Sequence, residues 1–200
     1  MPFAYLTKGF RGVIFCLSVT ALLPGCFGWV ELPPVTARAA VASGAAFGPT
    51  PERPAGTAFS KAAMVEGLTC NLPGRGEMEE MVRANAPGFA GGLIHLRHAY
   101  LEEVVVTATQ GDFAFLTALN LFYVTVGGNG LEMAYLGGAG AAEGFGGAVT
   151  ITPLDRVDLL DLMEGQLCGA VVVVADGVSP ETEVIFDAEA VLTVHAEVGF

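Results

Sequence analysis

Four cysteines have the most distinctive chemistry in this sequence: Cys16, Cys26, Cys70 and Cys168. A thiol can act as a nucleophile, carry a covalent modification or pair in a disulfide, and its surroundings decide which. Neither Cys70 nor Cys168 has a histidine nearby in sequence or a catalytic motif around it. Gly-x-Ser-x-Gly and His-Glu-x-x-His motifs are also absent from the sequence. The sequence therefore predicts no catalytic residue and no enzyme.

The three histidines do not form a recognisable metal motif. His95 and His98 are three residues apart in a segment expected to be a strand, where such positions point to opposite faces. His195 lies about a hundred residues further along the chain. The sequence predicts scattered surface histidines.

A run of carboxylates recurs at every third position near residue 160. Such a run could hold Ca²⁺ in principle, but it lacks the ligand order and the central glycine of an EF-hand. The Gly-rich stretch 137–147 likewise lacks the dinucleotide fingerprint, because Glu143 stands where a glycine is required. We expect a solvated polar face and no metal or cofactor. The carboxylates are Asp155, Asp158, Asp161 and Glu164.

The first residues have the pattern of an export signal. Lys8 and Arg11 precede an uncharged apolar run from Gly12 to Leu23. This run has about 12 residues, whereas a helix needs roughly 20 to span the hydrocarbon core of a bilayer. The sequence predicts a signal peptide over residues 1–25.

The end of this run resembles the lipobox of bacterial lipoproteins, in which a leucine and two small residues precede the lipidated cysteine. Leu23, Gly25 and Cys26 match that motif, and Pro24 departs from it. The resemblance implies that Cys26 carries a lipid. It further implies an exported protein at the outer membrane or cell surface, or in the periplasm without the lipid. The alternative is cleavage by the general signal peptidase, whose nearest small-x-small site is Ala37-Arg38-Ala39.

Two cysteines remain if Cys16 is removed with the signal peptide and Cys26 is lipidated. In an exported protein such a pair favours one disulfide, here between Cys70 and Cys168. The bridge would close a loop of nearly 100 residues and contribute about 3–5 kcal/mol in the chain-entropy model. The alternative is two separate buried thiols.

Residues 26–60 are rich in Ala, Gly, Thr and Pro and lack a sustained periodicity. This composition predicts a flexible linker between the lipid and the folded domain. The alternative is an irregular arm packed on the domain, with Trp29 and Val30 making the contact.

The remaining residues, 61–200, predict a mainly β domain with one short N-terminal cap helix. Met78, Met81 and Val82 share one face of that helix, and Asn85 and Pro87 end it. Short strands separated by Gly-containing turns follow, so we expect an antiparallel β-sandwich.

The clearest strand is the last one, where apolar residues alternate with polar ones. It is expected to form a hairpin with the β-branched segment that follows Cys168. The apolar positions are Val184, Phe186, Ala188, Ala190, Leu192, Val194, Ala196 and Val198.

Three stretches make the chain similar to secreted bacterial lipoproteins of uncharacterised function with β-sandwich domains: "EEVVVTATQGDFAFL", "DLLDLMEG" and the final strand pair. The similarity runs from about Leu93 to the C-terminus. It implies an architecture and no active-site residue.

The formal net charge of −12 restricts the possible partners. Nucleic acid and anionic lipid surfaces are bound through clusters of Lys and Arg, which this chain lacks. The sequence therefore predicts a lipid-anchored structural or interaction module, with envelope proteins or glycans as partners. The alternatives are a secreted ligand- or cation-binding protein and a small outer-membrane β-barrel. The barrel is suggested by the alternating apolar residues before the terminal Phe200.

Overall fold

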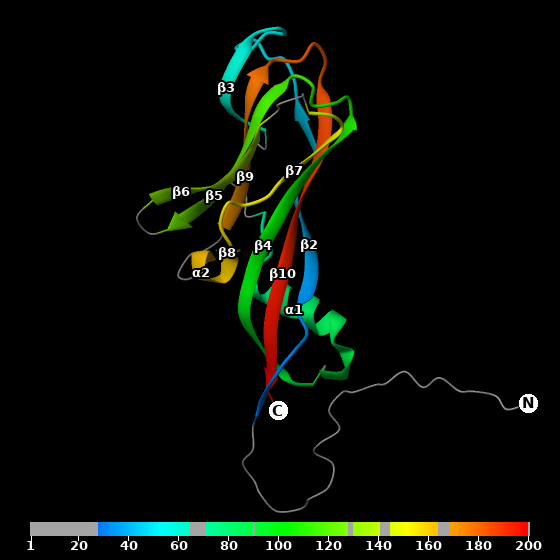
Figure 1. Cartoon of the computed structure of the whole chain (residues 1–200), viewed down its shortest axis with the longest axis vertical. Helices are drawn as coiled ribbons and strands as arrows, with labels where there is room; N and C mark the ends of the chain where they lie inside the picture. Colours follow the sequence, from blue (N-terminus) through cyan, green and yellow to red (C-terminus); the bar gives the residue numbers. More distant parts are fainter. Residues whose placement is uncertain are drawn as a thin grey trace, which may run out of the picture.

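The computed structural model describes residues 28–64, 71–89, 91–127, 130–140, 145–163 and 169–199. These residues are mainly β, as the sequence predicts (Figure 1). The strands are β1 (Trp29–Glu31), β2 (Val35–Phe47), β3 (Ala58–Ala63), β4 (Leu93–Gln110), β5 (Leu116–Gly127), β6 (Gly130–Gly140), β7 (Ala148–Ile151), β8 (Val157–Asp158), β9 (Gly169–Val178) and β10 (Val184–Gly199). The helices are α1 (Arg75–Asn85), the 3₁₀ turn η1 (Pro87–Phe89) and α2 (Leu159–Met163).

The strands form two separate antiparallel sheets. In the six-stranded sheet, β10 lies between β4 on one side and β1 and β2 on the other, and β7 and β8 pair with the far edge of β4. The four-stranded sheet has the order β3-β9-β5-β6. Figure 1 shows β4 and β10 running along most of the length of the molecule. The predicted antiparallel, sandwich-like architecture is confirmed.

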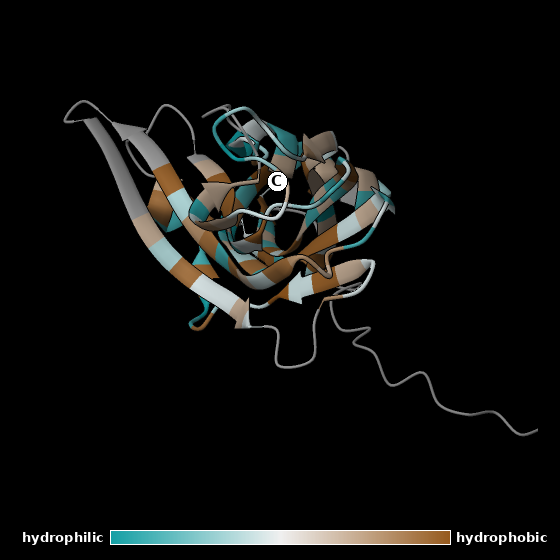
Figure 2. Cartoon of the chain, turned by 90° about the horizontal axis from the view of Figure 1, so that it is seen from above, coloured by the Kyte–Doolittle hydropathy of each residue, from teal (hydrophilic) through white to brown (hydrophobic). Residues whose placement is uncertain are grey.

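The apolar face of β10 anticipated from the sequence is confirmed at every position. All eight alternating residues from Val184 to Val198 are buried. Bands of opposite hydropathy alternate along the ribbons in Figure 2. An antiparallel strand with one face toward the core requires this period of two.

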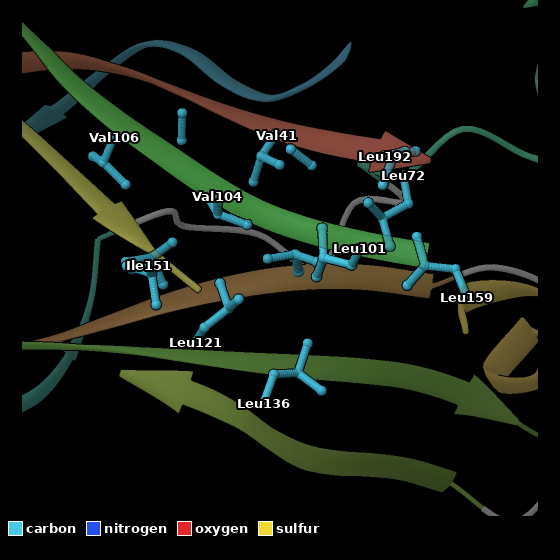
Figure 3. Packing of buried hydrophobic residues seen from close by; sticks show 14 of the residues in the cluster. Val41, Leu72, Leu101, Val104, Val106, Leu121, Leu136, Ile151, Leu159 and Leu192 are labelled. Atoms are coloured by element: carbon cyan, nitrogen blue, oxygen red, sulfur yellow. The ribbon is translucent and has the colours of Figure 1, made fainter. Parts of the chain in front are cut away.

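The core fills the space between the two sheets. Leu101 and Val104 of β4 lie in the same hydrophobic cluster as Leu121 of β5 and Leu136 of β6, and Figure 3 shows them with Ile151 of β7. Burying one such side chain contributes about 1.5–3 kcal/mol. The cluster therefore holds the two sheets together by apolar contact.

Helix α1 covers the residues over which the sequence predicts a short helix. Its first turn is closed by the Gly74 N–H, which donates to Glu77 Oε2 at 2.7 Å. Met78 and Val82 are buried on one face of the helix, and this helix contacts β2, β4 and β10. It therefore packs on the six-stranded sheet.

The predicted flexible linker over residues 26–60 is wrong for the part that the structure describes. Strand β2 pairs with β10 from Val35, opposite Val194, to Phe47, opposite Val184. Val41 and Phe47 are buried in the core. The alternation is present in the sequence, but it is carried largely by alanine, whose small side chain gives a weak hydrophobic signal. The sheet therefore begins at Trp29, inside the predicted linker.

The predicted hairpin between the last two strands is also wrong. Strand β9 pairs with β3 and β5, whereas β10 belongs to the other sheet. The chain crosses between the sheets at the buried Ser179. There the Ser179 N–H donates to Thr57 O at 2.8 Å, and the Gly56 N–H donates to Ser179 O at 2.9 Å. Strands β9 and β10 thus each turn an apolar face toward the shared core. They are consecutive in sequence but do not pair with each other.

Because β2 is part of the sheet, substitutions at two neighbouring positions of this strand should change the free energy of unfolding by unequal amounts. Val41→Asp would bury an unpaired carboxylate and should lower the free energy of unfolding by about 3 kcal/mol or more. Ala40 is exposed opposite Glu189, so Ala40→Lys should change it by no more than about 0.5 kcal/mol. Urea unfolding measures both. Equal, negligible effects would show that this segment is a free linker after all.

Candidate functional site

The three predicted site residues, Cys26, Cys70 and Cys168, lie outside the described residues. Residues that follow each of them are described. Trp29 begins β1 three residues after Cys26, Asn71 directly follows Cys70, and Val171 lies in β9 three residues after Cys168.

Asn71 joins the chain that follows Cys70 to the chain that follows Cys168. Its side-chain Nδ2 donates to Val171 O at 2.8 Å, and the Val171 N–H donates to Asn71 Oδ1 at 2.8 Å. An asparagine side chain thus pairs with the backbone of β9 as a neighbouring strand would. Two segments a hundred residues apart in sequence are brought side by side.

The pairing of β4 and β10 assembles a polar and aromatic surface on the solvent side of the six-stranded sheet. We call it the histidine face, and it consists of His98, Tyr100, Arg156, Asp158 and His195. His98 and His195 are direct cross-strand partners, and their ring centroids are 6.4 Å apart. The prediction of scattered histidines is therefore wrong for this pair.

The opposite-face argument for His95 and His98 is wrong as well. The register between β4 and β10 shifts at this point, because His98 pairs with His195 while Leu96 pairs with Ala196. Arg97 is the extra residue of a β-bulge in β4. The bulge shifts by one residue the alternation of side chains between the two faces of the sheet. His95 and His98 therefore lie on the same face of the sheet.

Asp158 holds one edge of the histidine face in place. Its Oδ1 accepts the backbone N–H groups of Ala99 at 3.0 Å and Leu160 at 3.1 Å, and its Oδ2 lies 2.6 Å from His98 Nδ1. Its side chain is only 9% exposed, so the solvated carboxylate expected from the sequence is wrong for this residue. Asp155 and Asp161 are exposed, and Glu164 lies outside the described residues.

Three side chains surround the Tyr100 ring on this face. The His98 ring lies nearly parallel to it with centroids 5.3 Å apart, and the His195 ring meets it edge-on at 5.7 Å. The Arg156 guanidinium lies 3.6 Å from the centre of the Tyr100 ring. Such a surface offers ring faces, imidazole nitrogens and a guanidinium to a ligand. Within the described ranges, no group of three or more His, Cys, Asp or Glu residues is close enough to hold a metal ion.

Two clefts lie away from the histidine face. One, of about 650 Å³, is lined by small and loop residues that include Gly56, Gly111 and Ser179. The other, of about 630 Å³, lies between β2 and α1 and includes Arg38 and Glu80. Neither cleft gathers the histidines or the aromatic rings.

Two titratable groups with shifted pKa values are explained by the fold. The pKa of Asp176 is lowered mainly by the hydrogen bond from Ser60 Oγ at 2.6 Å, and then by that from the Lys61 N–H at 2.9 Å. Lys61 has φ +55°, so Asp176 stabilises an irregular point in β3. Burial raises the pKa of Tyr123 to about 12. Neither group belongs to the histidine face.

Tyr123 predicts a specific loss of stability in alkali. Its hydroxyl is buried and has no hydrogen-bond partner in the described part of the chain. The unfolded chain loses the phenolic proton near pH 10.0 and the folded chain near 12, so the free energy of unfolding should fall as the pH rises between these values. Tyr123→Phe should remove this contribution and change stability at neutral pH by no more than about 1 kcal/mol.

Urea unfolding of both chains at about pH 8 and about pH 11 measures the difference. The stability of Tyr123→Phe should fall less than that of the unsubstituted protein. Equal losses in the two chains would contradict the assignment to Tyr123.

No helix in the described residues is both long and apolar enough to cross a membrane. No protein family, curated protein or solved structure matches this chain.

Proposed function

We propose that this chain is a lipid-anchored cell-envelope protein whose β-sandwich acts as an interaction module close to the membrane. The observation that carries the proposal is the start of β1 at Trp29, three residues after Cys26. Three residues span at most about 11 Å. A lipid on Cys26 would therefore hold the end of the sandwich near the bilayer, without the long linker that the composition suggested.

The position of β2 supports cleavage before Cys26 over cleavage at the alternative site. Ala37 and Ala39 lie inside β2, opposite Leu192 and Ala190 of β10. Cleavage after Ala39 would remove β1 and the first residues of β2 from the sheet. A mature chain that starts at Cys26 keeps every described strand.

The Asn71–Val171 hydrogen bonds support a disulfide between Cys70 and Cys168 as part of the proposal. A disulfide needs Cα atoms about 4.4–6.8 Å apart. This distance is attainable for Cys70 and Cys168, because Asn71 and Val171, which follow them in sequence, are hydrogen bonded to each other. The bridge would reinforce a contact between segments a hundred residues apart.

Intact-mass measurement on protein purified from its native envelope tests the proposal. The expected mass is that of a chain starting at Cys26, with added acyl groups and two hydrogens fewer than the dithiol form. Cys26→Ser should abolish the acyl mass and the incorporation of labelled fatty acid. Cys16→Ser, in the predicted signal peptide, is the matched control and should change neither.

An unacylated native chain that starts at another residue would overturn the proposed anchor. A mass that keeps both hydrogens would overturn only the disulfide.

A second candidate function, glycan binding at the histidine face, is favoured by the ring faces and the guanidinium gathered around Tyr100. Soluble peptidoglycan fragments should shift the imidazole NMR signals of His98 and His195. Tyr100→Ala should weaken binding by about tenfold, or about 1.4 kcal/mol. Tyr135→Ala, an exposed tyrosine on the other sheet, is the control. Unchanged imidazole signals at millimolar fragment concentration would exclude this candidate.

A further inference from the structure

One end of the six-stranded sheet exposes three large apolar side chains. Trp29 is 53% exposed, Val30 47% and Leu93 74%. Trp29 and Leu93 are both register partners of Gly199, so they lie on either side of it in one row across β1, β10 and β4. Figure 1 shows the C-terminal end of β10, which carries Gly199, at one end of the molecule. We call Trp29, Val30 and Leu93 the apolar edge.

The fold holds the Trp29 ring in a defined position. A Cβ on Gly199 would come within 3.1–3.2 Å of the ring, so the indole packs directly on the glycine backbone. The same ring lies 5.4 Å from that of His95. The edge therefore presents a fixed aromatic surface at the end of a paired strand.

Polar groups follow directly behind the apolar edge. Glu31, Glu197 and His95 form a row two residues further along the three strands. Arg97 Nη2 lies 2.6 Å from Glu197 Oε2, so the cation at this level is already paired with an acid. The apolar surface is thus a shallow layer, and the polar row behind it carries two carboxylates and a paired arginine.

We propose that the apolar edge lies in the headgroup region of the bilayer that anchors the chain. Cys26 is at most about 11 Å from Trp29, so a lipid on Cys26 would bring this edge, rather than another surface, to the membrane. Indole rings prefer the membrane–water interface, and the polar row behind the edge would stay in the headgroup and water layers. The inference rests on the proposed lipid anchor and adds an orientation, with the long axis of the sandwich directed away from the membrane.

Trp29 is the only tryptophan of the chain, so intrinsic tryptophan fluorescence reports on the edge directly. The acylated full-length mature protein is reconstituted into phosphatidylcholine vesicles. Its emission should shift to shorter wavelength relative to the unacylated protein in buffer. Lipids brominated near the headgroup end of the acyl chains should quench it more strongly than lipids brominated near the bilayer centre. Unshifted emission, with full quenching by aqueous iodide, would overturn the inference.

Two matched leucines test which surface makes the contact. Leu93→Ser should remove roughly half of the bromolipid quenching, because it makes the layer beside Trp29 polar. Leu154, 72% exposed between β7 and β8, is the control, and Leu154→Ser should leave quenching unchanged. Equal effects of the two substitutions would contradict an oriented contact.

The experiments can overturn the proposed lipid anchor and the proposed edge contact independently of each other. Missing acyl mass overturns the anchor, whereas an acylated protein whose Trp29 stays in water overturns only the edge contact. A blue shift that depends on protein concentration and occurs without vesicles would assign the edge to a second copy of the chain and so overturn the bilayer contact.

Discussion

The pairing of β10 with its two neighbours is the constraint on which the rest of the structure depends. Strand β10 has β4 along one side and β1 and β2 along the other. Its buried face, from Val184 to Val198, leaves water in the core that the four-stranded sheet and helix α1 complete. This requirement draws the first described strand and the last one into the same layer. Strands β1 and β2 thereby become part of the domain rather than a linker to it.

The same pairing of strands positions the apolar edge and the histidine face, the two surfaces for which we propose contacts. At one end, the shared register with Gly199 puts Trp29 and Leu93 in a row. Further along, the bulge at Arg97 turns His98 toward the face that carries His195. Trp29, Leu93 and the histidine face lie on the solvent side of strands whose other face is held by the core. The core can therefore hold the apolar edge and the histidine face at fixed positions relative to one another.

Burial and hydrogen bonding in the fold account for the shifted pKa values of Tyr123 and Asp176. The histidine face is built instead from ring contacts, a carboxylate that accepts backbone N–H groups and a guanidinium over Tyr100. These are binding and positioning groups, which agrees with an interaction module. With the proposed lipid on Cys26, the short reach to β1 would hold such a module at the membrane, where its partners would be envelope components.

The sequence by itself determined the fold class, helix α1 and the inward positions of β10, because local periodicity encodes which face of an element is apolar. The apolar run before Cys26 and the spacing of the cysteines are likewise local patterns, and the hypotheses drawn from them remain predictions. Only the tertiary structure decided that β9 and β10 lie in different sheets and that an Ala-rich segment is an edge strand of one of them. It also decided that His98 meets His195. These features depend on contacts between residues far apart in sequence, and periodicity does not specify which strands will pair.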